Sequence, residues 1–219
     1  MAGLHSRIRT VMILAKSKAE KVEDDSENDK SPLNSEGQKR TMRRILCIDG
    51  GGIKGTQPAA FLAGLEEDLD EPIGRYFDLI AGTSTGGILA IGLALGIRAK
   101  TLLELYENRG PTIFGQAGDR GWLGRKALEA RAALRHLVKP KHEASTLRDE
   151  LHAILGDKLI GEAETRLLIP AWDADQRSVY IYKTSHHPRL TKDYRKTALD
   201  AAMATSAAPT YFARHKTVD

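Results

Sequence analysis

Two glycine-rich turns constrain the fold of this chain more than any other feature of its sequence. The first is DGGGIKG at residues 49–55, and the second is GTSTGG at residues 82–87. Each turn follows a short apolar run and opens into a helical pattern, which gives the order strand, turn, helix twice over. In a parallel sheet both strands would end at the same edge, where open α/β sheets place their ligand sites. The stretch 44–96 therefore predicts an α/β fold with a functional site at that edge.

The second turn carries a candidate nucleophile. Residues 82–86 match G-x-S-x-G, a pattern that puts a serine, here Ser84, on a sharp turn between a strand and a helix. A serine that attacks an acyl carbonyl creates an oxyanion, which needs hydrogen-bond donors already in place. Glycines let a backbone approach a ligand closely, and the start of a helix adds unpaired N–H groups. The predicted donors are the N–H groups of Gly50, Gly51, Gly52 and Ile53.

The first turn also has a second interpretation. Gly50, Gly52 and Gly55 fit G-x-G-x-x-G, which in a dinucleotide-binding fold cradles a pyrophosphate. That fold needs an acidic residue at the end of the second strand, about 20 residues further on. Asp70 and Glu71 are near this distance but precede the second apolar run. A nucleotide-binding α/β protein therefore stays an alternative.

Three motifs together resemble those of a known family. DGGGIKG at 49–55, GTSTGG at 82–87 and TSAAPTYF at 205–212 are similar to the corresponding motifs of patatin-like phospholipases of the bacterial type, and they occur in the same order. The resemblance covers residues 42–219. It implies a three-layer α/β/α fold with a mostly parallel central sheet, and a serine and aspartate dyad that acts on acyl esters of lipids without histidine, metal or cofactor.

The resemblance assigns roles to particular residues. It implies that Ser84 is the nucleophile and that the base is the aspartate of a D-G-G or D-G-A motif, which here is Asp219. The sequence stops at this aspartate, so we expect a chain that is cut within the motif. A Ser-His-Asp triad stays open as an alternative, and its best base candidates are His186, His187 and His215.

Further residues are candidates for contact with lipid. Lys54 could attract an anionic head group, and Thr85 beside the nucleophile is a second predicted substrate contact. The glycine-rich stretch 111–125 carries Phe114 and Trp122 and predicts a lid or a membrane contact, unless its aromatic side chains fold inward. We expect a phospholipid or other acyl-lipid substrate and a protein that is cytoplasmic and peripheral at the membrane.

Composition is that of a globular enzyme domain with a tail. The chain has 219 residues, 41% of them hydrophobic, and a formal charge of +4, without the concentrated basic footprint of a nucleic-acid binder. We expect a flexible tail and linker over 1–41 and one domain over 42–219. The basic stretch 1–21 predicts a helix, either packed on the domain or touching a membrane. Cys47, the only cysteine, is expected to be buried.

Other helices and strands follow from local patterns. Ala59, Leu62, Leu65 and Leu69 fall at helical spacing and predict a helix that packs on the sheet through this face. The apolar run 88–95 predicts a helix that is buried against the sheet. A short helix is expected to end at Gly110, and Thr146 with Asp149 fits a capping box. Residues 166–172 and 178–185 predict two strands joined by a polar turn.

Two further functional alternatives remain. One is a lipid-binding or regulatory module of the same fold with little or no catalysis. The other concerns regulation, because some bacterial members of the family that this chain resembles are switched on by cyclic nucleotides in antiphage defence. A nucleotide activator and a homo-oligomer are both left open by the sequence.

Overall fold

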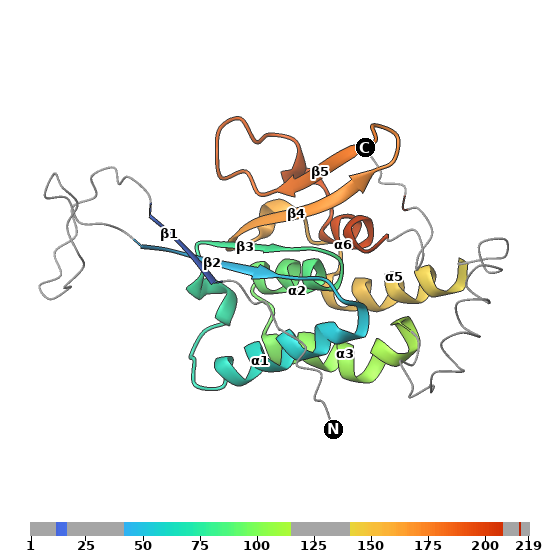
Figure 1. Cartoon of the computed structure of the whole chain (residues 1–219), viewed down its shortest axis with the longest axis horizontal. Coiled ribbons are helices and arrows are strands. Elements are labelled where there is room, and N and C mark those ends of the chain that lie inside the picture. Colours follow the sequence, from blue (N-terminus) through green and yellow to red (C-terminus); the bar gives the residue numbers. More distant parts are fainter. Residues whose placement is uncertain (1–11, 17–41, 115–140, 208–214, 216–219) are drawn as a thin grey trace, which may run out of the picture.

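The computed structural model describes residues 12–16, 42–114, 141–207 and 215. Its sheet has the strand order β1-β2-β3-β4-β5 (Figure 1). Pairing is parallel from β2 to β4 and antiparallel at both edges. The strands are β1 (Met12–Lys16), β2 (Met42–Ile48), β3 (Leu79–Gly82), β4 (Arg166–Asp173) and β5 (Ser178–Lys183). The predicted α/β class is confirmed, and the strands before the two glycine turns are parallel neighbours.

The described helices connect and cover this sheet. They are α1 (Thr56–Glu66), α2 (Thr85–Ala94), α3 (Ala99–Phe114), α5 (Lys141–Leu155) and α6 (Ala198–Ser206), with the 3-10 helices η1 (Gly52–Gly55), η2 (Ile73–Tyr76), η3 (Ile160–Glu162) and η4 (Asp193–Arg195). Among the described helices, none is long and apolar enough to cross a bilayer.

One face of the sheet is deeply buried. Leu46, Ile80 and Leu167 are paired across β2, β3 and β4 and are at most 3% exposed. Helices α2 and α6 contact the sheet, and α1, α3 and α5 form a second helical layer beyond them (Figure 1). Every residue of α2 is buried, which confirms the prediction that the apolar run 88–95 packs against the sheet. A helix enclosed on all sides needs an apolar surface all round.

The structure corrects the prediction for the N-terminal stretch. Residues 12–16, which fall in the predicted helix over 1–21, form strand β1 and pair with β2. A short apolar run is too short to hold a helix by itself, whereas the edge of β2 supplies partners for its backbone groups. The rest of 1–41 lies outside the described residues.

Three local helix predictions are also wrong in detail. Gly110 does not end a helix: α3 continues through it, and the glycine instead makes room for the Ile53 side chain, which an added Cβ would meet. Helix α5 begins at Lys141, so Thr146 is not its cap, although Gly156 with φ +57 does follow its end. Leu65 lies on α1 but is 49% exposed, whereas the neighbouring Leu62 is 3% exposed. The two strands predicted on either side of the polar turn are confirmed as β4 and β5.

A buried carboxylate joins three of the helices. Glu66, the last residue of α1, is 4% exposed. One of its oxygens accepts the N–H of Ile73 and the other accepts the N–H of Ala99, each at 2.8 Å. These two residues begin η2 and α3, and the first N–H groups of a helix have no partner inside it. Glu66 therefore satisfies two helix ends at once and ties them to α1.

We predict that Glu66→Gln destabilises the fold by about 1–3 kcal/mol, because an amide accepts with one oxygen only and leaves one buried N–H unpaired. Urea unfolding of the variant would measure this loss. Glu67→Gln is the matched control, since Glu67 is exposed, and it should change stability by less than about 0.5 kcal/mol. Equal losses in the two variants would contradict the role of Glu66.

Candidate active site

The sheet brings the two glycine turns to one edge. Strands β2 and β3 are parallel, and their last residues, Ile48 and Gly82, lie opposite each other. The pairing continues one residue further, because the N–H of Thr83 donates to the Ile48 carbonyl at 3.3 Å. Both turns therefore leave the sheet side by side, as predicted from the order of the motifs.

Ser84 occupies a strained turn between β3 and α2. Its backbone angles are φ 52° and ψ −126°, a region that non-glycine residues rarely adopt. Its carbonyl accepts the N–H of Ile88 at 3.0 Å, so the helix starts immediately after the serine. Ser84 keeps part of its surface exposed, while Thr85 after it is fully buried. This is the geometry that the G-x-S-x-G pattern predicts for an exposed hydroxyl on a sharp turn.

The first turn lies directly against this serine. A Cβ added to Gly50 would stand 2.9 Å from the Ser84 Cβ and 2.8 Å from the Thr83 carbonyl oxygen. Real Cβ atoms do not approach other atoms so closely, so the contact requires glycine at this position. In the same way, a Cβ on Gly86 would collide with the Ile48 carbonyl. The glycines thus let backbone meet backbone where side chains would force the turns apart.

The N–H groups of the first turn fall into two sets. The N–H of Gly51 donates to the Thr85 hydroxyl at 3.0 Å and is therefore engaged. Gly52, with φ +60, and Ile53 begin η1, and the first N–H groups of a helix have no acceptor within it. Lys54 beside them is exposed. Of the predicted oxyanion donors, those of Gly52 and Ile53 are placed at a helix start beside the serine turn.

Thr85 is buried between the two turns and holds the first turn in place. Its side chain has no exposed surface, its hydroxyl holds Gly51, and its carbonyl accepts the hydroxyl of the buried Tyr106 at 2.7 Å. We predicted Thr85 as a substrate contact, whereas the structure gives it a place in the packing between the two turns. Gly55 belongs to the same packing, because a Cβ there would lie 2.8 Å from the Tyr106 ring.

Thr205 is a residue of the site that local sequence reasoning did not single out. Its hydroxyl accepts the N–H of Ser84 at 3.0 Å and donates to the Pro170 carbonyl at 2.7 Å. It lies on α6, and a Cβ on Gly87 would touch its methyl group at 2.8 Å. Thr205 therefore fixes the strained serine turn to α6 and β4. Its place at the start of the TSAAPTYF motif was the available signal.

A small pocket of about 130 Å³ opens beside the turns. It is lined by residues at the ends of the three parallel strands, namely Cys47, Ile48, Asp49, Ala81, Gly82, Thr83 and Pro170. Cys47 is half-buried and not enclosed as we expected. Partial burial raises the pKa of its thiol, and the Asp49 carboxylate raises it further. The thiol is therefore held in its neutral form beside the serine turn.

The other candidate bases bond to groups other than Ser84 or lie outside the described residues. His186 bonds to the Thr184 hydroxyl at 3.0 Å, His187 accepts the N–H of Arg189 at 3.2 Å, and His215 bonds to the Asp200 carboxylate at 2.9 Å. None of these rings forms a hydrogen bond with Ser84 within the described ranges. Asp219 lies outside the described residues.

The dinucleotide interpretation of the first turn lacks its acidic partner. Asp70 and Glu71 lie between α1 and η2, before β3 begins. They therefore do not stand at the end of the second strand, where a dinucleotide-binding fold places the carboxylate that holds a ribose. Gly50 in this turn packs against Ser84 instead.

Comparison with known proteins decides the family. The family model described as patatin-like phospholipase matches residues 46–219, which include both glycine turns and Thr205. The chain belongs to the patatin-like phospholipase family. The resemblance read from the three motifs is thereby confirmed, together with the patatin-like α/β fold.

Two relatives in sequence agree with the family assignment. A Pseudomonas aeruginosa protein named cGAMP-activated phospholipase is 39% identical over 169 residues, covering 77% of this chain and 47% of the relative. Patatin-like protein 2 of Oryza sativa subsp. indica is 34% identical over 196 residues, covering 83% and 46%. The structure of VipD from Legionella pneumophila aligns with a TM-score of 0.46 at 14% identity, covering 94% and 48%. The chain spans about half the length of the curated relatives it matches.

We predict that Thr205→Val slows reaction of Ser84 with a fluorophosphonate probe about 100-fold, because a small misplacement of a reacting group can cost this much. The valine keeps the shape but cannot accept the Ser84 N–H or bond to Pro170. Thr205→Ser, which keeps the hydroxyl, should label at nearly the rate of the unaltered chain. Equal labelling of the valine and serine variants, with equal thermal midpoints, would show that the hydroxyl does not position Ser84.

Proposed function

We propose that this chain carries the catalytic site of a serine lipid acyl hydrolase that cleaves acyl esters of phospholipids. The observation that carries the proposal is the strained Ser84 turn with the first glycine turn packed against it. Membership of the family supports the proposed reaction class, and relatives named phospholipase support a lipid substrate.

In the proposed reaction, the Ser84 hydroxyl attacks the ester carbonyl and gives its proton to the Asp219 carboxylate. The carbonyl oxygen becomes an oxyanion, and the N–H groups of Gly52 and Ile53 stabilise it. The lysolipid then leaves with the proton from Asp219, and the acyl group stays on Ser84. Asp219 next takes a proton from water, which attacks the acyl-enzyme carbonyl. The bond to the Ser84 oxygen then breaks, the fatty acid leaves, and Asp219 returns the proton to that oxygen. The exposed Lys54 would attract the anionic head group.

The strain at Ser84 supports this role. A residue held in a rare backbone conformation costs of order 1–3 kcal/mol and persists only where the surrounding structure enforces it. Here the Thr205 bond, the start of α2 and the Gly50 contact all enforce it. A serine on such a turn precedes the helix and keeps its hydroxyl accessible, as the G-x-S-x-G pattern predicts.

We predict that Ser84→Ala lowers hydrolysis of phospholipid vesicles and of a p-nitrophenyl ester by about 10³-fold or more, as expected when a nucleophile is removed. Fatty-acid release and p-nitrophenol absorbance would measure it. Ser178→Ala is the matched control, because Ser178 is an exposed serine at the start of β5, and it should retain activity. Equal activity of Ser84→Ala and the unaltered chain would refute the proposal. Lipid binding without any hydrolysis by the unaltered chain would favour a non-catalytic binding module.

Regulation by a nucleotide is a second proposal, and it rests on the name of the Pseudomonas aeruginosa relative, a cGAMP-activated phospholipase. If this chain responds in the same way, adding cGAMP should raise ester hydrolysis several-fold with the Ser84 requirement unchanged. An unchanged rate at saturating cGAMP would speak against it for this chain. We also propose that the protein is cytoplasmic and contacts the membrane peripherally, because its proposed substrate is a phospholipid.

A further inference from the structure

The β4–β5 hairpin has an apolar surface that points away from α6. Side chains alternate along both strands, so Ile169 and Tyr182 are buried on the helix side. On the other side Trp172 pairs with Val179, and these two side chains are 63% and 61% exposed. Large apolar side chains exposed side by side on a strand pair are unusual on a surface that only meets water.

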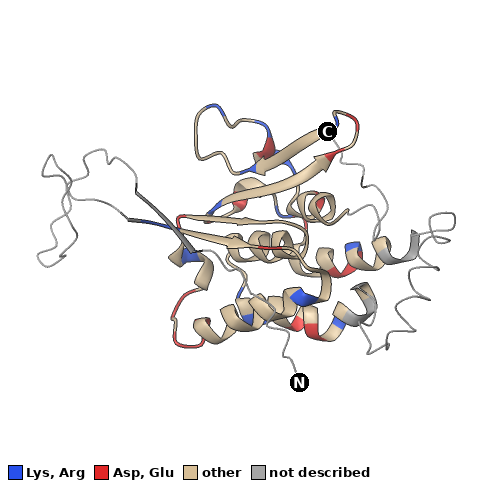
Figure 2. Ribbon diagram, in the orientation of Figure 1, with Lys and Arg blue, Asp and Glu red and all other residues tan. Residues whose placement is uncertain are grey.

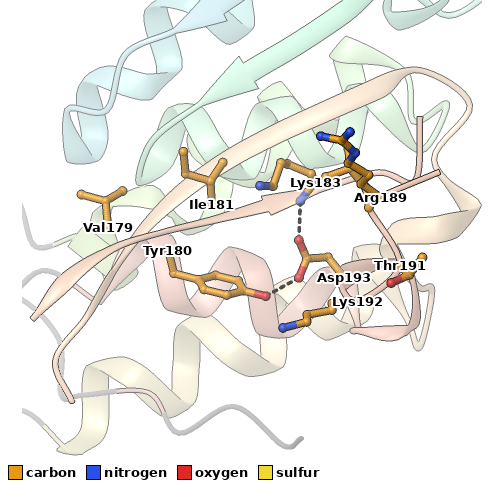
Figure 3. A pocket seen from close by; sticks show the side chains of 9 residues that line it. Val179, Tyr180, Ile181, Lys183, Arg189, Thr191, Lys192 and Asp193 are labelled. Atoms are coloured by element: carbon orange, nitrogen blue, oxygen red, sulfur yellow. Dashed lines mark hydrogen bonds between the residues drawn. The ribbon is translucent and has the colours of Figure 1, made fainter. Parts of the chain in front are cut away.

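Basic side chains continue this surface along the edge strand. A pocket of about 330 Å³ lies between β5 and the chain that follows it (Figure 3). Its lining includes the apolar Val179 and Ile181 and the basic Lys183, Arg189 and Lys192. Arg189 and Lys192 are exposed, and Figure 2 shows Lys and Arg along the loop after β5. Apolar and cationic groups thus line the same pocket along β5.

The acidic groups nearby do not cancel this positive charge. Asp193 lines the pocket, but its carboxylate is buried and accepts the Tyr180 hydroxyl and the Lys183 N–H (Figure 3). Asp173, at the β4–β5 turn, accepts the N–H groups of Asp175 and Gln176, each at 3.0 Å. The exposed Asp175 shares that turn with the exposed Arg177. Within the described residues, Arg189 and Lys192 therefore form no ion pair with an acidic side chain.

The pKa of His186 is also affected by the positive charges near β5. Partial burial lowers the pKa of its ring, and the charges of Arg166, His187 and Lys183 lower it further. Burial, the largest cause, disfavours any charge, whereas the nearby cations disfavour only a further positive charge and so favour an anion. This agrees with the positions of the exposed Arg189 and Lys192.

The apolar end of this surface, at Trp172 and Val179, is the end that lies toward the candidate active site. The Thr205 hydroxyl bonds both to the Ser84 N–H and to the Pro170 carbonyl, and Pro170 pairs with Ile181 on β5. Strand β4 runs parallel to β3, so Trp172 near its end lies toward the edge at which Ser84 follows β3. A flat partner seated on Trp172 and Val179 would therefore be presented at the edge that carries the serine.

We propose that Trp172, Val179 and Ile181, together with Lys183, Arg189 and Lys192, form a docking surface for an anionic phospholipid bilayer. The proposal rests on the proposed function, since a lipid hydrolase must reach ester bonds at a bilayer surface. Tryptophan is favoured at the level of the head groups, and lysine and arginine are attracted to anionic lipids. A small anion would use the cations but not the exposed Trp172 and Val179, which favours a bilayer as the occupant.

Vesicle binding tests the charged part of this surface. The assay uses the full chain with Ser84→Ala, so that no lipid is consumed, and compares vesicles containing phosphatidylglycerol with vesicles of phosphatidylcholine alone. Arg189→Glu with Lys192→Glu should weaken binding to the anionic vesicles at least about tenfold. The matched control is Lys100→Glu with Arg148→Glu, which changes the net charge equally at exposed positions on α3 and α5. The control should change binding by less than about twofold.

Fluorescence tests the apolar part. The chain has two tryptophans, so Trp122→Phe leaves Trp172 as the only one. Its emission should shift to shorter wavelength when anionic vesicles are added, and lipids with brominated acyl chains should quench it. Trp172→Ser, in a chain that keeps Trp122, should weaken vesicle binding several-fold. Equal thermal midpoints would show that these variants fold.

Several outcomes would overturn the docking surface. One is that the Ser84→Ala chain does not bind anionic vesicles. Another is that the charge-reversal pair and its control lose vesicle binding equally. A third is that the emission of Trp172 does not shift although vesicles are bound. Binding of inorganic phosphate that falls with Arg189→Glu and Lys192→Glu, while vesicle binding stays unchanged, would replace the bilayer by a small anion. None of these measurements needs turnover. Hydrolysis of a soluble p-nitrophenyl ester separately tests the proposed function, so the two proposals can fail independently.

Discussion

The architecture of the site depends on a contact between two backbones. The Gly50 Cα lies against Ser84, and Gly86 lies against the carbonyl of Ile48, at positions where any side chain would collide. Close contact of this kind holds the two turns in a fixed relation without flexible groups between them. The parallel register of β2 and β3 brings the turns to this contact, and α2 starts directly after the serine. The strained conformation of Ser84 is maintained by the same packing.

The parts of the fold that could be predicted are those that a local sequence pattern indicates. The two glycine turns, the apolar run of α2 and the alternating strands of the β4–β5 hairpin each carry their own signal within a few residues. Ser84 was found because the turn that exposes it needs glycines at fixed offsets. The order of these signals then indicated parallel strands that end at one edge. Family resemblance added Asp219, which no local pattern singles out.

The parts that could not be predicted depend on partners far away in the sequence. Gly110 resembles a helix end, but it is a point of close packing against Ile53. Residues 12–16 form a strand because β2 offers them an edge. Glu66 resembles any surface glutamate of an amphipathic helix, yet its carboxylate serves two helix starts. In each case the deciding contact is tertiary, and one sequence contains no local trace of it.

The bond between Thr205 and Ser84 spans 121 residues of the chain. During synthesis the ribosome releases the serine turn, the first glycine turn and α2 long before α6 has been made. An N-terminal intermediate can therefore pair β2 with β3, but its serine turn lacks the threonine that fixes it. The site is completed only when one of the last described helices docks on the sheet. Because the proposed substrate is a phospholipid, this order of assembly delays a competent nucleophile until α6 has been made.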